Sequence, residues 1–378
     1  MLQKKTPYSP ELTREIQKGF YGRELDEKNP ADPKDLQAFV YPLYVIFLLA
    51  PTVTLQFGTA VQIFRIILLF CAAGCVPLWI YAIRFNHTRR FTVFLVILTI
   101  STFPVILEDR QQNLSALVVL LLAGAFAARA HRWFILSGFL LALSTIKPQL
   151  SCFLIAWMFL MVLAKWKELH KIAWGFSATF LGLLTAATAI SPHWPRGFWM
   201  AVTKYMSYGL GPAIFRVMLP PVFAFPAIVL LVLFVGFICW RCRKEQPETL
   251  SYAGSLAAVV TATVALTTQA AHYQLLLFPA LLFLLNSKKT VVKPNFLLGV
   301  LTKGTFACLF WQWEAALVLA LRSVFTQHVP VPMLAELPLW TSPAFPVLTL
   351  SAVVVSVSWM QLNKLNQSVT SLQETHLD

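Results

Sequence analysis

Charged residues, and acidic ones above all, are scarce in this sequence. Asp and Glu number 16 among 378 residues, and 12% of all residues are charged. Hydrophobic residues make up 58% of the chain, and the mean hydropathy is +0.68. No polar stretch is long enough to form a soluble domain with a core of its own. This composition excludes an ordinary soluble protein.

Several sequence motifs are also missing. The chain has no phosphate-binding Walker loop, no Rossmann glycine pattern and no HExxH zinc motif. An ATP-driven pump and a zinc protease are therefore disfavoured. The N-terminus is charged and no apolar region follows it directly, which is unlike a signal peptide. Internal repeats of the kind found in transporters are not visible.

Cysteines are few, and their spacing is only weakly suggestive. Cys71 and Cys75 lie about one helical turn apart, as do Cys239 and Cys242. Either pair could ligate a metal, but no His or second pair stands at the spacing that would complete a site. We interpret them as small apolar residues of helices. We expect no metal, no cofactor and no disulfide framework.

Long apolar runs dominate the chain. They are continuous rather than alternating, which is typical of membrane-spanning helices and not of a β-barrel. We predict an all-α polytopic membrane protein with about 11 transmembrane helices. The first run, 39–54, is short and holds Pro42 and Pro51; it is predicted to be interfacial or re-entrant, with a spanning helix as the alternative. The later runs are 57–83, 91–107, 114–128, 133–146, 149–164, 172–190, 221–240, 251–270, 275–286, 304–322 and 342–360.

Basic residues gather in every second connection between these runs, so they lie on one face. The positive-inside rule assigns that face to the cytoplasm. The basic connections are 84–90, 129–132, 165–171, 241–244 and 288–293, and the opposite face collects 108–113, 146–149, 191–220, 271–274 and 323–341. The predicted organisation is a polar extracytoplasmic head (1–38), a transmembrane domain (39–360) with an outer loop (191–220), and a cytoplasmic tail (361–378).

The predicted head carries seven basic and seven acidic residues. If the run 39–54 does not span the membrane, this head lies outside with no preceding helix to carry it there. We therefore expect that a helix is missing upstream of Met1. If the run does span, the head is cytoplasmic and this expectation lapses.

Six consecutive polar residues, Glu108 to Asn113, stand between two apolar runs. Polar side chains are costly near lipid, so the cluster suggests a functional site. The helices 114–128 and 149–164 both begin on the same face, where helix N-termini favour anions. Arg110 precedes the first and Lys147 the second, which predicts a phosphate cradle. The alternative is that Asn113 only caps its helix and that the cations reach lipid headgroups.

Two ionisable residues lie within the predicted spans. Arg65 and Glu314 are each roughly 12 Å from the outer end of their helices, at 1.5 Å per residue. Their similar depth predicts an ion pair.

Two further outer segments hold candidate residues. His272 opens the turn 271–274 and could orient a substrate or donate a proton, or be an ordinary interface histidine. The loop 191–220 combines aromatic residues with Arg196 and Lys204. That mixture suits sugar stacking and lipid phosphate, and it equally suits an amphipathic helix at the membrane interface.

Several stretches appear in an order typical of one enzyme family. They are FVYPLYVIFLLAP, Arg110 to Asn113 followed by LSALVVLLLAGAF, then LSGFLLALSTIKPQL, then His272-Tyr273. Over about 8–290, and most strongly over 100–165, the chain resembles glycosyltransferase family 87, the polyprenol-phosphate-mannose-dependent mannosyltransferases of bacterial membranes. The resemblance implies a GT-C fold in the bacterial cytoplasmic (inner) membrane, with an active site on the extracytoplasmic side.

The resemblance also implies a mechanism and partners. A base would deprotonate the acceptor hydroxyl and cations would hold the leaving lipid phosphate. The expected base is Glu108 or Asp109. The expected phosphate ligands are Arg110, Lys147, Arg196 and Lys204, and the expected substrate-positioning residues are Gln111, Asn113, Gln149, His272 and Tyr273. The partners would be membrane lipid, a polyprenyl-phosphate sugar and a glycan or glycolipid acceptor, with no nucleic acid.

The chain departs from the family pattern in two places. Members have an N-terminal helix and a catalytic Asp in the first outer loop, and neither is found here. Gly stands in the family where this chain has Arg110. Two other functions therefore remain open: a transporter or flippase of lipid-linked substrate, and an inactive truncated homologue.

Overall fold

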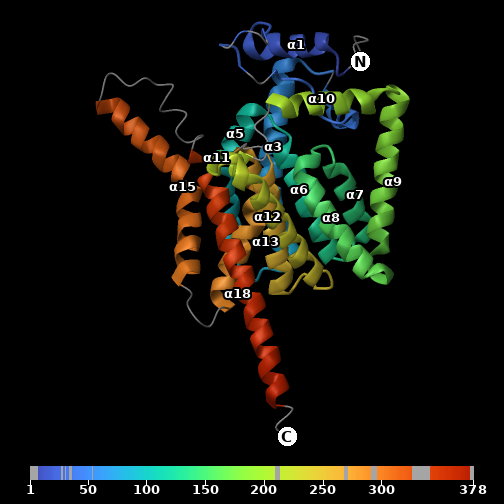
Figure 1. The fold of residues 1–378 in the computed structure, drawn as a ribbon. Helices are drawn as coiled ribbons and strands as arrows, with labels where there is room; N and C mark the ends of the chain where they lie inside the picture. The colour runs from blue at the N-terminus through green and yellow to red at the C-terminus, as the bar shows by residue number, and fades with distance from the viewer. Residues whose placement is uncertain are drawn as a thin grey trace.

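A computed structural model describes residues 7–26, 29, 31–33, 36–52, 54–208, 213–267, 271–290, 296–325 and 341–374. The regular structure in these ranges is helical, with no β-strand. This confirms the predicted all-α class. Upright helices form a bundle, and α1 (Pro10–Tyr21) and α10 (Trp194–Tyr208) lie across one end of it, which we call the head end (Figure 1).

The remaining helices of the first half are η1 (Leu43–Val45), α2 (Ile46–Leu49), η2 (Ala50–Thr52), α3 (Phe57–Ala82), α4 (Arg89–Ile100), α5 (Phe103–Gln111), α6 (Ser115–Ala130), α7 (Phe134–Ser144), α8 (Pro148–Ala164) and α9 (Trp166–Ile190). Those of the second half are α11 (Ala213–Met218), α12 (Pro221–Arg241), α13 (Leu250–Leu266), η3 (Ala271–Leu277), α14 (Phe278–Thr290), α15 (Phe296–Phe325) and α18 (Ala344–Glu374).

Five helices of the described ranges are long and apolar enough to cross a membrane: α3, α9, α12, Phe296–Arg322 of α15 and Ala344–Gln361 of α18. The pair α4 and α5 also qualifies, as one broken span bent by 53°. The other apolar helices have 10–17 residues. The chain is thus a polytopic membrane protein with five or six candidate spans in these ranges, and the predicted number of about 11 is not confirmed.

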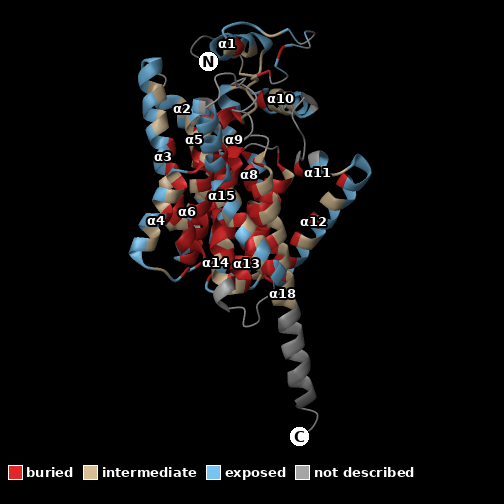
Figure 2. Ribbon diagram, turned by 90° about the vertical axis from the view of Figure 1, so that its left-hand side faces the viewer, coloured by how far each residue is buried: buried red, intermediate tan, exposed pale blue. Residues whose placement is uncertain are grey.

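One of the short apolar helices, α13, lies in the centre of the bundle. Residues 251–265 of α13 are all buried, and this helix packs against α8, α12, α14 and α18 (Figure 2). A helix that is apolar all round is typical of a protein core or of a membrane span. The long helices lie around this centre and expose large apolar side chains, such as Phe70 (72%) and Phe225 (72%). Such exposed apolar faces are suited to lipid.

The apolar run 91–107 does not form the single helix that was expected. It breaks between α4 and α5, where Ser101 and Thr102 donate hydroxyl hydrogen bonds to Leu98 O (2.9 Å) and Thr99 O (2.7 Å). Pro104 follows directly, and it has no N–H to donate to the carbonyl of Ile100. Because of this break, Glu108 to Gln111 form the last turn of α5 rather than a loop.

The run 39–54 folds as three short helical pieces, η1, α2 and η2, over Leu43–Thr52. Ten helical residues are about 15 Å long, which is half the thickness of a bilayer core. This length agrees with the prediction of an interfacial or re-entrant segment rather than a spanning helix.

The predicted outer loop 191–220 is largely helical, because it contains α10 and α11. The alternative interpretation, a helix, is therefore the one that the described residues support. Residues 209–212 lie outside the described ranges, as do 291–293 of the last basic connection and 326–340 of the predicted segment 323–341.

Two glycines let α7 and α9 approach each other closely. A Cβ added at Gly175 would lie 2.5 Å from the carbonyl oxygen of Ile135, and one at Gly138 would overlap the backbone of Ile172. Small residues at such crossings are typical of membrane helices, since association there depends on close packing.

The head is attached to the bundle through aromatic contacts. Tyr8 donates its hydroxyl to Tyr41 O at 2.8 Å, and its ring packs on Phe39 and Phe198. A Cβ at Gly197 would lie only 2.8 Å from the Tyr8 ring, so this glycine makes room for it. The head therefore packs on both the 39–41 segment and α10.

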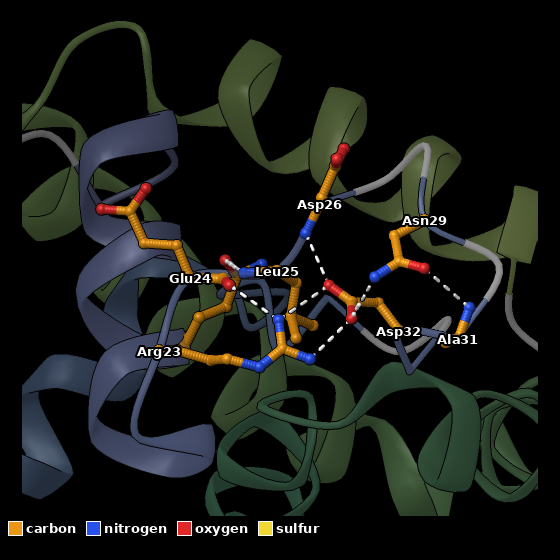
Figure 3. Close-up of polar contacts among 8 residues, drawn as sticks. Arg23, Glu24, Leu25, Asp26, Asn29, Ala31 and Asp32 are labelled. Carbon is orange, nitrogen blue, oxygen red and sulfur yellow. Dashed lines mark hydrogen bonds and ion pairs between the residues drawn. The ribbon is translucent and has the colours of Figure 1, made fainter.

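Asp32 organises the connection that follows α1 (Figure 3). Its carboxylate accepts hydrogen bonds from Arg23 Nη1 (2.9 Å) and Nη2 (2.6 Å), from the backbone N–H of Asp26 (2.7 Å) and from Asn29 Nδ2 (3.2 Å). Four donors on one ionised carboxylate favour its charged form. They lower the pKa of Asp32 from 3.8 to about 2, with the Arg23 hydrogen bonds as the largest cause.

We expect the fold of the head to depend on pH through Asp32. Because its folded-state pKa is lowered, the stability that it contributes is present above about pH 4 and is lost as the pH falls toward 2. Pepsin cleavage within residues 7–38 should accelerate over that interval, and Asp32→Asn should be cleaved rapidly at pH 4 as well. Asp26→Asn, which keeps its backbone N–H, is the control. Equal cleavage of wild type at pH 4 and pH 2 would contradict the expectation.

Candidate functional site

Three predicted polar segments meet at the head end of the bundle. The last turn of α5 and the first turn of α6 both contact η3, and the connection between α7 and α8 joins them through Lys147. The segments 108–113, 146–149 and 271–274 thus lie together, as the charge pattern predicted. The residues Glu108, Asn113, Ser115, Lys147 and Tyr273 form what we call the buried cluster.

Lys147 is at the centre of the buried cluster and is only 2% exposed. Its ammonium donates to Asn113 Oδ1 and to Ser115 Oγ (2.7 Å), and lies 4.7 Å from the centroid of the Tyr273 ring. Two acceptors and an aromatic face satisfy all three N–H groups. Burial lowers the pKa of Lys147, against the opposing influence of Tyr273 and Glu108. The alternative that Lys147 reaches lipid headgroups does not agree with this burial.

Glu108 is also 2% exposed, and its Oε1 accepts a hydrogen bond from the backbone N–H of Ala116 at 2.6 Å. Asn113 Oδ1 accepts from the N–H of Ser115 at 3.2 Å. These bonds fill the N-terminal turn of α6, whose N–H groups would otherwise lack partners. Side chains of the protein itself thus bind N–H groups of α6 where a phosphate was expected. The alternative, capping by Asn113, is not confirmed, because the N-cap residue of α6 is Leu114 and has no side-chain cap hydrogen bond.

Gln112 turns the chain between α5 and α6. It adopts the left-handed conformation, with φ 50° and ψ 44°, and its backbone N–H donates to Glu108 O. This conformation costs a non-glycine residue roughly 1–2 kcal/mol. Contacts of the neighbouring residues offset that cost, and the turn brings Glu108 and Asn113 to the same helix end.

Asp109 forms an ion pair that the sequence did not predict. Arg65 Nη2 lies 2.7 Å from Asp109 Oδ2, and Arg65 Nε lies 3.1 Å from both carboxylate oxygens. Side-chain exposure is 43% for Arg65 and 14% for Asp109, so the pair is accessible. The predicted pairing of Arg65 with Glu314 is wrong, because α3 packs against α5 and Glu314 is exposed on α15.

The other predicted site residues have exposed side chains and are not members of the buried cluster. They are Arg110 and Gln111 at the end of α5, Gln149 in the first turn of α8, and Arg196 and Lys204 on α10. Among the described residues, no three His, Cys, Asp or Glu side chains are grouped closely enough to hold a metal ion.

Polar groups of η3 next to the buried cluster lack partners within the described ranges. His272 is 6% exposed, its ring meets the Tyr273 ring edge-on at 4.6 Å, and neither of its ring nitrogens has a hydrogen-bond partner there. Gln274 donates from Nε2 to Ser342 O at 2.8 Å, while its Oε1 has no partner there. Buried polar groups are normally satisfied, so these atoms are suited to a ligand or water.

Tyr41 is a site residue that sequence reasoning missed. Burial raises the pKa of its hydroxyl, and Tyr273, Glu108 and Tyr205 act electrostatically in the same direction. Tyr41 packs against Phe39 and also lines the cavity described next. It stands in an apolar run with other aromatic residues, so no sequence signal distinguishes it.

A cavity of about 500 Å³ is lined in part by α3, the helix that carries Arg65, although neither Arg65 nor Asp109 is among its lining residues. Its walls are mainly apolar and come from the segment 39–55 and the start of α3, including Phe64, which directly precedes Arg65. Gln112 and Leu114 complete the lining, and Gln112 Nε2 lies 3.5 Å from Val61 O. The cavity and the Arg65–Asp109 pair thus share helix α3 and the residues around the α5–α6 turn.

Comparison with known proteins identifies the family. The model of glycosyltransferase family 87 matches residues 39–268, which is more than half of the chain. A search of curated proteins finds no match. The matched stretch includes the cavity, the Arg65–Asp109 pair and Lys147, and it ends just before η3. The chain therefore belongs to glycosyltransferase family 87.

Proposed function

We propose that this protein transfers a mannose-like hexose from a polyprenyl-phosphate donor to an acceptor hydroxyl, at the extracytoplasmic face of a bacterial inner membrane. Family membership supports glycosyl transfer. The observation that carries the finer proposal is that an accessible ion pair, Arg65–Asp109, and the wall of an apolar cavity share helix α3, where Phe64 of the wall directly precedes Arg65. A polyprenyl phosphate combines an apolar chain with an anionic head, so its site needs an apolar wall with a cation at the edge. We also propose that the chain has the GT-C fold with about 11 spans and that the reaction needs no cofactor.

Asp109 is the better candidate for the base. A base must be reached by the acceptor hydroxyl, and Glu108 is only 2% exposed with one oxygen on the Ala116 N–H. Asp109 is more accessible, with 14% of its side chain exposed, and Arg65 holds its carboxylate in place. A carboxylate oxygen has two lone pairs, so Asp109 Oδ1, which accepts only from Arg65 Nε in this pair, retains one for the substrate.

The transfer is a single displacement with inversion at the anomeric carbon. Asp109 takes the acceptor proton, the acceptor oxygen forms the new bond to that carbon, and the bond to the phosphate oxygen breaks. The lipid phosphate leaves with the electron pair, and its charge is stabilised by cations. Arg65 uses Nε and Nη2 to hold Asp109 and so positions the base. The phosphate leaves from the opposite face of the sugar, and the cations proposed to stabilise it are Arg110, Arg196 and Lys204.

The buried cluster has a supporting role in this proposal. Lys147 connects Asn113 and Ser115, and Glu108 holds the start of α6, so together they fix the turn that carries Asp109. His272, whose ring nitrogens lack partners in the described ranges, would bind a sugar hydroxyl. Arg196 and Lys204 on α10 would contact lipid phosphate at the interface.

Reconstituted protein should form a new glycosidic product when it is given radiolabelled polyprenyl-phosphate mannose and a glycan or glycolipid acceptor. Arg65→Gln should lower kcat/KM roughly 10–100-fold, since a charge-assisted hydrogen bond contributes about 1.5–3 kcal/mol. Arg90→Gln is the control and should keep full activity. Arg90 is exposed in the first turn of α4, and Asp109 lies on α5, beyond the other end of that helix.

The same vesicles separate the competing functions. Movement of labelled donor across the membrane without a new glycosidic bond would identify a transporter or flippase. Neither product nor movement would identify an inactive homologue. Either result would overturn the proposed transfer.

A further inference from the structure

A second cavity, which unlike the first has mainly polar walls, lies at the end of the bundle away from the buried cluster. It has a volume of about 330 Å³ and forms where the C-terminal ends of α6 and α8 meet the connection between α12 and α13. The helix α6 runs from Ser115, in the buried cluster, to Arg129, in this cavity. Fourteen residues at 1.5 Å each place the two about 21 Å apart.

The lining of this cavity is strongly charged, with an excess of cations. Its lining contains four basic side chains and two acidic ones. The basic ones are Arg84, Arg129, Arg132 and Lys165, and the acidic ones are Glu168 and Glu248. Glu248 is already engaged by Arg84 at 3.5 Å. Such an excess of positive charge around a concave surface attracts anions.

Part of this charge has a structural explanation. Arg84 Nη2 donates to Ala130 O at 2.7 Å, which satisfies a carbonyl at the end of α6. Cations near helix C-termini also interact favourably with the helix dipole. These effects account for Arg84 but not for a buried guanidinium without acceptors.

Arg129 is such a guanidinium. It is only 4% exposed, and its Nε and Nη1 have no hydrogen-bond partner among the described residues. Its guanidinium lies over the Tyr252 ring, with 4.9 Å between Cζ and the ring centroid, and it interacts electrostatically with Lys165. A buried charge without hydrogen bonds is strongly disfavoured unless an anion compensates it.

We propose that this cavity binds a phosphate group through Arg129. Its Nε–H and Nη1–H donate to phosphate oxygens, while Arg132 and Lys165 contribute charge from the cavity wall. Arginine is the residue best suited to such contacts, since its planar guanidinium matches phosphate oxygens and remains charged when buried. The phosphate belongs either to a lipid headgroup or to a soluble phosphate. This site is separate from the residues proposed for sugar transfer, and phosphate binding to it can be measured without an assay of transfer.

Purified full-length protein in a neutral detergent should bind inorganic phosphate or dihexanoyl phosphatidic acid, as measured by calorimetric titration. Arg129→Gln and Arg132→Gln should each raise the Kd about 10-fold or more, which corresponds to the loss of one hydrogen bond to a charged group. Arg90→Gln is the matched control, since Arg90 is basic, exposed and outside the lining of the cavity. Its Kd should equal that of wild type.

Binding of both anions would indicate a site for soluble phosphate, and binding of phosphatidic acid alone would indicate a lipid headgroup; both support the proposal. Absence of binding for both anions would overturn it. An unchanged Kd in Arg129→Gln and Arg132→Gln would also overturn it. If Arg129→Gln does not fold, the exposed Arg132→Gln decides the outcome.

Discussion

Asp109→Asn is expected to lower kcat for sugar transfer at least about 100-fold, the lower end of the range for removing a general base. Asparagine has nearly the same shape and still offers Oδ1 to Arg65 Nε, but it cannot take the acceptor proton. The measurement is transfer from radiolabelled donor in vesicles, with KM and kcat determined separately. Donor binding should change much less than kcat, because the base acts on the acceptor.

Glu248→Gln provides the control for Asp109→Asn, since Glu248 is an exposed acid near the opposite end of the bundle. Size-exclusion profiles and melting curves should match wild type for both variants. An unchanged kcat in Asp109→Asn would remove Asp109 from the mechanism. If Glu108→Gln abolished transfer and Asp109→Asn did not, the base would be Glu108.

Glu108→Ala is expected to destabilise the protein by about 1–3 kcal/mol, the usual cost of leaving a buried hydrogen-bonding group without its partner. The substitution leaves the Ala116 N–H without its acceptor and takes away the carboxyl group that acts electrostatically on Lys147. Denaturant or thermal unfolding in detergent measures the change. Glu108→Gln should cost less, since its amide oxygen can still accept from Ala116.

Glu248→Ala is the matched control for Glu108→Ala and should change the free energy of unfolding by less than about 1 kcal/mol, as expected for an exposed ion pair. The double variant Glu108→Gln/Lys147→Met should lose less than the sum of its single variants, because the two side chains belong to one network. Equal stability of Glu108→Ala and wild type would show that the buried cluster does not hold the α5–α6 turn.

Local sequence patterns predicted those features of the structure that depend only on residues close together in the chain. The apolar runs correspond closely to α3, α6, α12 and α13, because hydropathy depends on composition over one helix. The polar stretch 108–113 was recognised as a site candidate for the same reason: polar residues near lipid are costly wherever their neighbours lie. The break before Pro104 was missed, since a continuous apolar run gives no hydropathy signal at a proline.

Pairings between distant residues could not be predicted in this way. Arg65 and Asp109 are 44 positions apart, and only the packing of α3 on α5 brings them together. Similar depth in the membrane suggested Glu314 as the partner of Arg65. Depth does not determine, however, toward which side of its helix a side chain points. Lys147 likewise turns inward to Asn113 and Ser115, which no spacing rule indicates.

The amino-acid sequence by itself determined that this is an all-helical membrane protein, that its polar segments 108–113, 146–149 and 271–274 share one end, and that it resembles its family. These properties follow from hydropathy, charge distribution and local motifs, which need no knowledge of neighbours. The tertiary structure alone decided which carboxylate is buried and which is accessible, and where an unpaired guanidinium remains. Burial and pairing depend on which helix faces pack together, and that is a property of the whole bundle.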